Sequence, residues 1–212
     1  MQNNRHQTEN RAAIANAPDH VQIQTITGCN AKCIFCPNGK TRHNIPAGRR
    51  MGWDLYRSIV DQCLELGIRR YSVYLMNEPM LDRELAERVA YVSTRIKKPQ
   101  YVKVTSHGGL LTERMAKGLL DSGLDKLKIS VQSLDPDTYR NIMGLPLAKT
   151  LKNIDRFAQQ ALSQAPYQST VPISRRRALS QRNNPYGRPD DAVLLVALHE
   201  DKCIGYQGLL PG

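Results

Sequence analysis

A strand pattern runs directly into a loop of three cysteines in the stretch VQIQTITGCNAKCIFCP, residues 21–37. Apolar and polar residues alternate over Val21–Ile26, and this period of two is typical of a strand. Cys29, Cys33 and Cys36 follow at once. Three thiolates in one short loop suit a soft metal centre, because a disulfide uses only two of them. A closed zinc site or a closed cubane uses four thiolates, so three would leave one metal position open for a ligand.

Other interpretations of this loop remain open from the residues alone. Zinc ribbons and fingers supply their ligands as two pairs, and no second pair follows, because Cys63 and Cys203 are isolated. The spacing of two-cluster ferredoxins is not matched either. Three ordinary reduced cysteines are the simplest alternative, but their polar and glycine neighbours are not a core pattern. Cys63 lies at helical spacing with Ile59 and Leu66 and is interpreted as a core residue.

The spacing Cys-x-x-x-Cys-x-aromatic-Cys, formed by Cys29, Cys33, Phe35 and Cys36, resembles the signature of the radical S-adenosylmethionine (SAM) superfamily. The resemblance implies that the three cysteines bind three irons of a [4Fe–4S] cluster and that SAM chelates the fourth iron. It also implies that Phe35 approaches the adenine of SAM. The reduced cluster would then cleave SAM to methionine and a 5′-deoxyadenosyl radical, which abstracts hydrogen from a substrate.

Composition limits the remaining possibilities. The 212 residues suffice for one sizeable core, or for one domain with a small appendage. Neither a signal peptide nor a membrane-spanning run is found, so we expect a cytoplasmic protein without a membrane partner. The net charge of +11 comes from scattered basic residues, and aromatic residues are only 6%. Nucleic-acid binding is therefore possible but not favoured over a solvated basic surface.

Strand and helix patterns alternate after the cysteine loop, which predicts an α/β fold with parallel strands. With the resemblance, this pattern indicates an abbreviated partial (β/α) barrel of the radical SAM type. The expected strands after the first are 70–75, 101–105 and 126–131, and the expected helices are 53–66, 82–96, 112–122, a short one opening at Pro136, and 147–162. Thr112 is the predicted N-cap of its helix. Ligand sites of barrel folds collect at the carboxyl ends of such strands.

The second strand is followed by Met76-Asn77-Glu78-Pro79, which resembles the Gly-Gly-Glu-Pro motif of the superfamily. The resemblance implies that Asn77, Glu78 and Pro79 contact the amino group of SAM. Met76 and Asn77 replace both glycines of the motif, so the backbone need not approach the ligand as it does in relatives.

Polar residues also end the third and fourth strands. Thr105 and Ser106 stand where relatives often carry Thr-Asn-Gly, and the resemblance implies hydroxyl contacts to the cofactor. Ser130 and Gln132 alternate with an apolar residue and so point the same way, and the resemblance implies that they contact the ribose or carboxylate of SAM. His107 is a candidate acid–base group that we interpret as a solvated loop residue, so no catalytic residue is assigned.

Three segments are expected. A disordered polar N-terminus covers 1–19, the radical SAM core covers 20–161, and a C-terminal segment covers 162–212. The C-terminal segment is expected to form a β-hairpin from 192–198 and 203–210, and its sequence resembles part of a GNAT acetyltransferase. It is therefore interpreted as a truncated acetyltransferase-like piece or as an addition to the sheet.

The sequence thus predicts a radical SAM enzyme whose substrate is not readable. The resemblance implies an electron donor such as flavodoxin or ferredoxin and a substrate that is a peptide or a small molecule. Two alternatives remain: a metal-binding or cluster-binding protein without catalysis, and an acyl-CoA-binding acetyltransferase remnant. Asp135 is either a contact to SAM or the N-cap of the helix that opens at Pro136.

Overall fold

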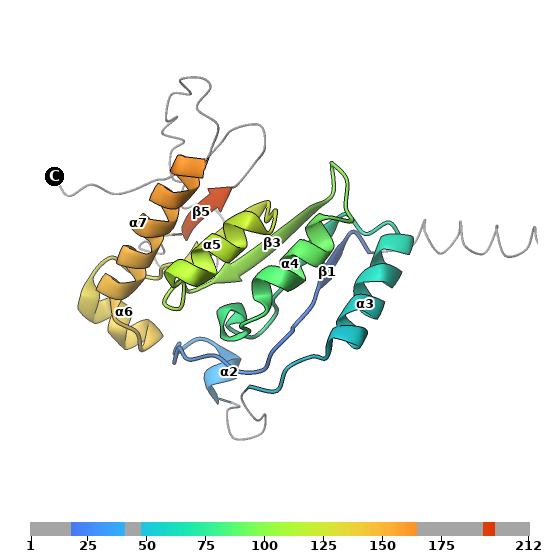
Figure 1. Ribbon diagram of the computed structural model, residues 1–212. Coiled ribbons are helices and arrows are strands. Elements are labelled where there is room, and N and C mark those ends of the chain that lie inside the picture. Colours follow the sequence, from blue (N-terminus) through green and yellow to red (C-terminus); the bar gives the residue numbers. More distant parts are fainter. Residues whose placement is uncertain (1–17, 41–47, 165–192, 198–212) are drawn as a thin grey trace, which may run out of the picture.

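Strands and helices alternate along most of the chain (Figure 1). The computed structural model describes residues 18–40, 48–164 and 193–197. Its elements, in chain order, are β1 (His20–Gln22), α2 (Pro37–Lys40), α3 (Trp53–Glu65), β2 (Arg70–Ser72), the 3-10 turn η1 (Pro79–Leu81), α4 (Leu85–Ser93), β3 (Tyr101–Ser106), α5 (Glu113–Asp121), β4 (Lys126–Ser130), α6 (Pro136–Met143), α7 (Leu147–Gln164) and β5 (Val193–Ala197).

The sheet has the strand order β1-β2-β3-β4-β5. The first four strands are parallel, so each crossover passes over one face and the carboxyl ends of these strands meet at one edge. Strand β5 runs antiparallel to β4. The α/β fold of a partial barrel is confirmed. Residues 193–197 of the expected hairpin form a strand, and its expected partner, residues 203–210, lies outside the described residues.

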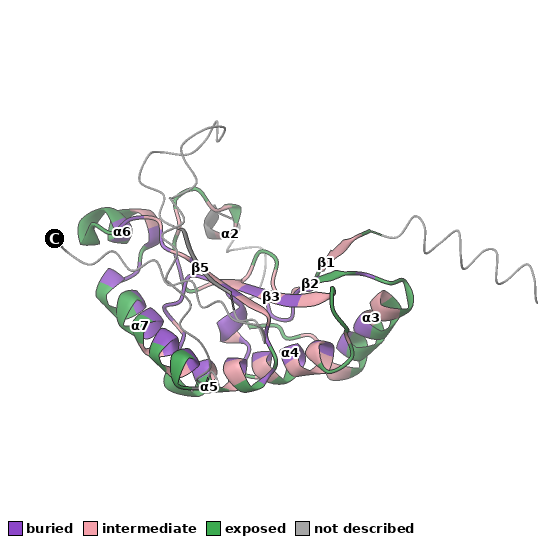
Figure 2. Cartoon of the chain, turned by 90° about the horizontal axis from the view of Figure 1, so that it is seen from above, coloured by how far each residue is buried: buried purple, intermediate pink, exposed green. Residues whose placement is uncertain are grey.

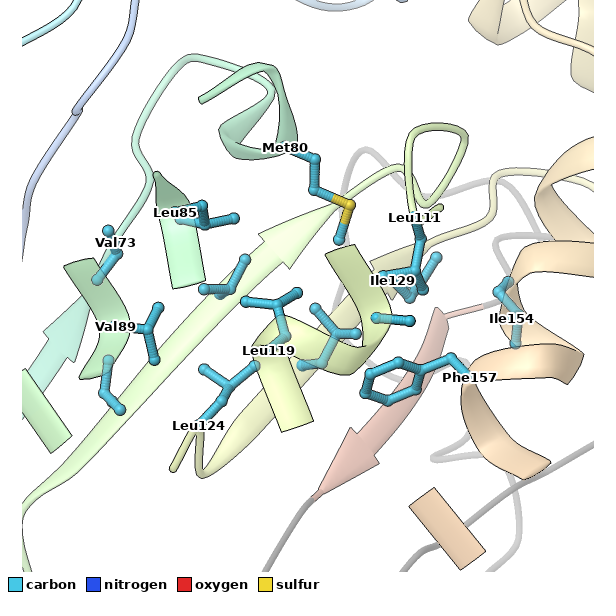
Figure 3. Close-up of a cluster of buried hydrophobic side chains, with 14 of the residues drawn as sticks. Val73, Met80, Leu85, Val89, Leu111, Leu119, Leu124, Ile129, Ile154 and Phe157 are labelled. Carbon is cyan, nitrogen blue, oxygen red and sulfur yellow. The ribbon is translucent and has the colours of Figure 1, made fainter. Parts of the chain in front are cut away.

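Helices α3, α4, α5 and α7 lie along one face of this sheet (Figures 1 and 2). Buried and partly exposed residues alternate strictly in β3 and β4. The buried set faces the helices, and side chains of the strands, α4, α5 and α7 form one cluster there (Figure 3). We call the opposite side the inner face. It carries Tyr101, Lys103 and Thr105 of β3 and Lys126, Lys128 and Ser130 of β4.

Local capping explains where two helices begin. The Thr112 hydroxyl accepts a hydrogen bond from the backbone N–H of Met115, as predicted for the N-cap of α5. The Asp135 carboxylate accepts from the N–H of Thr138 at 2.8 Å, so Asp135 is the N-cap of α6. Hydrogen bonds from the backbone and side chain of Thr138 lower the pKa of Asp135. The capping alternative for Asp135 is therefore the one that the structure shows.

Strands β1 and β2 are shorter than the sequence pattern predicts. They pair over three positions each. Beyond them the first strand turns to another partner, because the carbonyls of Thr25 and Thr27 accept from the N–H groups of Met51 and Gly48. The helix expected over 82–96 also begins later, at Leu85.

The described residues also bear on the expected segments. Residues 1–17 lie outside the described part of the chain, and with them most of the expected disordered N-terminus. Helix α7 continues past the expected core boundary at Ala161 to Gln164. Strand β5, from the expected C-terminal segment, belongs to the same sheet as the core. None of the described helices is long and apolar enough to cross a membrane.

Candidate functional site

The cysteine loop follows the first strand and is fixed against the end of α6. The backbone N–H groups of Lys32 and Ile34 donate to the carbonyls of Met143 and Ile142 at 2.8 and 3.0 Å. The chain must turn sharply after α6, and Gly144 does so with a φ of 68°. A Cβ at position 144 would lie 2.9 Å from the Cβ of Lys32, so glycine is needed for the close approach as well.

The three thiols of this loop are partly buried and form no disulfide among the described residues. The Cys29 sulfur accepts from the N–H of Ala31 at 3.4 Å, and the Cys33 sulfur lies 3.4 Å from the sulfur of Met143. Burial, aided by the charge of Glu78, raises the pKa of Cys29 to about 11. A bare thiolate is thus disfavoured at this position, and a soft cation that takes the place of the proton would relieve the cost.

A cluster makes a different geometric demand from a single ion. No group of three His, Cys, Asp or Glu side chains in residues 18–40, 48–164 and 193–197 converges as a single-ion site does. In a [4Fe–4S] cluster each iron takes its own thiolate, so the three sulfurs need not meet at one point. Cys63, on α3, packs against the core as its helical spacing predicted.

The loop after β2 is held next to the cysteine loop. The N–H of Glu78 donates to the carbonyl of Gly28 at 3.0 Å. The N–H of Met76 donates to the Gln24 side chain at 3.1 Å, and the Asn38 side chain donates to the carbonyl of Met76 at 2.7 Å. The two loops that the sequence assigns to the cluster and to SAM are therefore adjacent.

The carboxylate of Glu78 is buried and fully engaged by the protein. One oxygen accepts from the N–H of Met80 at 3.1 Å and from the Ser106 hydroxyl at 2.7 Å. The other accepts from the backbone N–H of His107 at 3.1 Å and lies 3.2 Å from Nε2 of the His107 ring. A carboxylate offers about four acceptor positions, and groups of the protein itself occupy those of Glu78. Glu78 therefore stabilises the conformation of its own loop. Pro79 follows directly as the first residue of η1 and is also buried.

His107 is the residue that the sequence interpretation missed, since it is buried and not solvated. Its Nδ1 accepts from the N–H of Gly109 at 2.9 Å, which places the proton of the neutral ring on Nε2. That N–H lies 2.9 Å from the Asn30 side-chain oxygen, between Cys29 and Cys33 in the sequence. His107 thus joins the cysteine loop to the Glu78 loop. In the sequence, the only sign of this role is a histidine directly after the third expected strand.

The polar residues at the strand ends lie on different sides of the sheet. Ser106 is buried on the helix side, where its hydroxyl is committed to Glu78. Thr105 lies on the inner face, and its Oγ1 is buried without a hydrogen-bond partner. The Asn77 Nδ2 is a second such atom. Ser130 ends β4 on the inner face, and Gln132, beyond the strand, is partly exposed. Unpartnered buried polar atoms are costly, so Thr105 and Asn77 fit a polar ligand such as SAM.

Apolar side chains surround this edge of the sheet. Ile34 and Phe35 of the cysteine loop are 64% and 59% exposed. Leu75 and Met76 after β2, and Leu134 after β4, are also exposed. Phe35 is thus an exposed aromatic ring beside the cysteines, and its contact with the adenine of SAM stays a prediction.

A comparison with protein families settles the relationship of this chain. The model of the Radical SAM superfamily matches residues 23–167, which include the three cysteines and the carboxyl ends of β2, β3 and β4. The chain belongs to the radical SAM superfamily. Superfamily members use a [4Fe–4S] cluster and SAM, and the residues described above supply thiolates and unpartnered polar atoms that fit both groups.

Curated relatives share part of their length with this radical SAM chain. A protein of Methanococcus maripaludis named probable GTP 3′,8-cyclase is 32% identical over 136 residues, which are 64% of this chain and 44% of the relative. A protein of the same name from Methanosarcina mazei is 29% identical over 148 residues, or 68% of this chain and 42% of the relative. The chain thus spans less than half the length of these relatives.

Solved structures show the same fold. Streptococcus suis SuiB bound to S-adenosylmethionine matches 74% of this chain and 36% of its own, with a TM-score of 0.61 and 19% identity. Native anSMEcpe with bound AdoMet matches 67% of this chain and 42% of its own, with a TM-score of 0.54 and 20% identity.

Proposed function

We propose that this chain binds a [4Fe–4S] cluster through Cys29, Cys33 and Cys36, and SAM beside it, to generate a radical that abstracts hydrogen from a substrate. The observation that supports this most strongly is the contact between the cysteine loop and the ends of β2 and β3, through Gly28, Glu78 and His107. When bound, the cluster supplies the electron that cleaves SAM to methionine and a 5′-deoxyadenosyl radical.

The chain's own residues hold and orient the reactants. Asn77 would donate its free N–H to SAM, and Thr105 would offer its unpartnered hydroxyl. Ser130 and Gln132 would complete the polar contacts from β4. Glu78, with Pro79 beside it, would keep the loop backbone in place, while Ser106 and His107 hold the Glu78 carboxylate. Phe35 would cover the adenine and exclude water from the cluster side.

The partners follow from the same proposal. The relatives' name states GTP as what they act on, and SuiB has been solved bound to a precursor peptide, so a small molecule and a peptide are the substrate classes to test. A flavodoxin or a ferredoxin would supply the electron. The four cysteines of the described part form no disulfide, which suits a reducing cytoplasm.

Anaerobic reconstitution tests the proposal. The chain is loaded with iron and sulfide, then given SAM and dithionite, and 5′-deoxyadenosine is measured by chromatography. The proposal expects it from the native chain and not from Cys33→Ala. A chain that holds iron or zinc but never cleaves SAM would be a metal-binding module. A chain that instead binds acyl-CoA equally well with Cys29, Cys33 and Cys36 replaced by alanine would be an acetyltransferase remnant.

A further inference from the structure

The inner face of the sheet carries lysines where a neutral polar surface would suffice. Lys103 of β3 and Lys126 and Lys128 of β4 all occupy its partly exposed positions. Buried and partly exposed residues alternate along β3 (Figure 2) and along β4, so these lysines lie on the face opposite the helix-covered core. Residues 103 and 126 are more than twenty positions apart in the sequence. The pairing of β3 with β4 brings them together.

The three lysines occupy neighbouring positions on two adjacent strands. Lys103 and Lys126 are register partners on neighbouring strands, which lie about 4.8 Å apart. Lys128 follows two residues, or about 6.6 Å, further along β4 beside Thr105. Like charges on adjacent strands repel each other, so this arrangement costs stability in the free chain.

Nearby groups offset only part of this repulsion. Lys126 lies over the ring of Tyr101 at 3.9 Å, and Lys103 lies over the ring of Tyr74 at 5.6 Å. Lys128 has no aromatic face of this kind among the described residues. No ion pair between residues of the described part includes any of the three lysines. Their charge is thus available to a ligand.

Two neighbouring groups respond to this positive field. Burial lowers the pKa of His20, and the charges of Lys103 and Arg70 lower it further. Burial opposes ionisation of Tyr74, but neighbouring side-chain hydrogen bonds, one of them from Lys103, and the charge of Lys103 outweigh it and lower the pKa of Tyr74. Both shifts favour the less positive form of the group, as a cationic surface requires.

The lysines lie on the same strands as the proposed SAM contacts. Lys103 precedes Thr105 by two residues, and Lys128 precedes Ser130 by two. The proposed SAM contacts therefore lie about 7 Å further along the strands than the lysines, toward the edge where the cysteine loop lies. This is the geometry of a substrate anchored by its anionic end.

We infer that Lys103, Lys126 and Lys128 form an anion site on the inner face that anchors a small substrate bearing several phosphate charges. Lysine binds phosphate as a point charge, and a polyphosphate chain spreads its charges as these lysines do along two strands. The inference rests on the proposed function in treating this ligand as the substrate. Binding of the anion is measured separately from SAM cleavage.

Calorimetry on the reconstituted full chain tests the anion site, with inorganic tripolyphosphate, GTP and guanosine as probes. The test variant carries Lys103→Gln, Lys126→Gln and Lys128→Gln. The matched control carries Lys117→Gln, Lys149→Gln and Lys152→Gln, which remove the same charge from exposed positions of α5 and α7. The site predicts binding of tripolyphosphate and GTP but not guanosine. The inner-face variant should bind both at least about tenfold more weakly, and the control should bind like the native chain.

A second measurement separates binding from packing. Without anion, the inner-face variant should melt at a higher temperature than the native chain, because the repulsion is gone; a lower melting temperature would show that the lysines only pack. Equal loss of binding in both variants, or tighter binding of a single-stranded RNA than of GTP by the native chain, would overturn the small-ligand site. The chain with Cys29→Ala, Cys33→Ala and Cys36→Ala should still bind tripolyphosphate, so failure of the cluster proposal would remain distinguishable.

Discussion

The two faces of the sheet differ in composition and burial. On the helix side, Val102, Val104, Leu127 and Ile129 are at most 1% exposed and pack into a core that any α/β protein needs (Figure 3). On the inner face, the residues between them are three lysines, Tyr101, Thr105 and Ser130, and the buried Thr105 hydroxyl has no hydrogen-bond partner. Stability alone does not explain such a face. Alternate residues of β3 and β4 thus differ in role: one set builds the core, and the other set is the one to which we propose that ligands bind.

Adjacent residues of β4 should show the largest contrast. Leu127→Ala should lower the free energy of unfolding by about 2–5 kcal/mol, because it leaves a cavity in a closed core. Lys128→Ala should change it by less than about 0.5 kcal/mol, since that side chain lies on the inner face. Urea unfolding of both variants measures the difference. Similar losses would mean that the inner face is also part of the core.

The bridge through His107 should give the next largest effect. His107→Asn keeps an acceptor for the N–H of Gly109 but removes the donor at the Nε2 position, and we expect a loss of about 1–3 kcal/mol in stability together with a lower iron content after reconstitution. His107→Gln places an N–H near that position and should lose less.

A double-mutant cycle decides whether this bridge acts through Asn30. His107→Asn and Asn30→Ala should be non-additive, with a coupling of about 0.5–3 kcal/mol. Additive effects on unfolding would show that His107 stabilises only its own loop.

Neighbouring hydroxyls at the end of β3 should show a smaller contrast. Thr105→Val should weaken SAM binding by about tenfold, roughly 1.4 kcal/mol, and leave the stability of the ligand-free chain unchanged or higher, because its Oγ1 has no partner there. Ser106→Ala should instead lower stability, since Glu78 loses a donor. Calorimetry without oxygen and urea unfolding measure the two quantities. An unchanged SAM affinity for Thr105→Val would remove that residue from the site.

Periodicity and capping explain how much of this fold could be predicted from the sequence. Alternation in β3 and β4, the Thr112 cap and the cysteine spacing all depend on neighbours in the chain, and such patterns are visible without a structure. The link between Lys32 and Met143 spans most of the core, and Glu78 meets Ser106 28 positions later. Such pairs depend on which strands become neighbours. The three inner-face lysines looked scattered in the sequence for the same reason.

The central claim is that the three loop cysteines hold a [4Fe–4S] cluster, and iron content tests it most directly. After anaerobic reconstitution, the native chain and the Cys63→Ala control should each hold about four irons and show broad visible absorption, because Cys63 packs against the core. Cys33→Ala should lose both signals. Retention of about four irons by a chain with Cys29, Cys33 and Cys36 all replaced by alanine would contradict the claim.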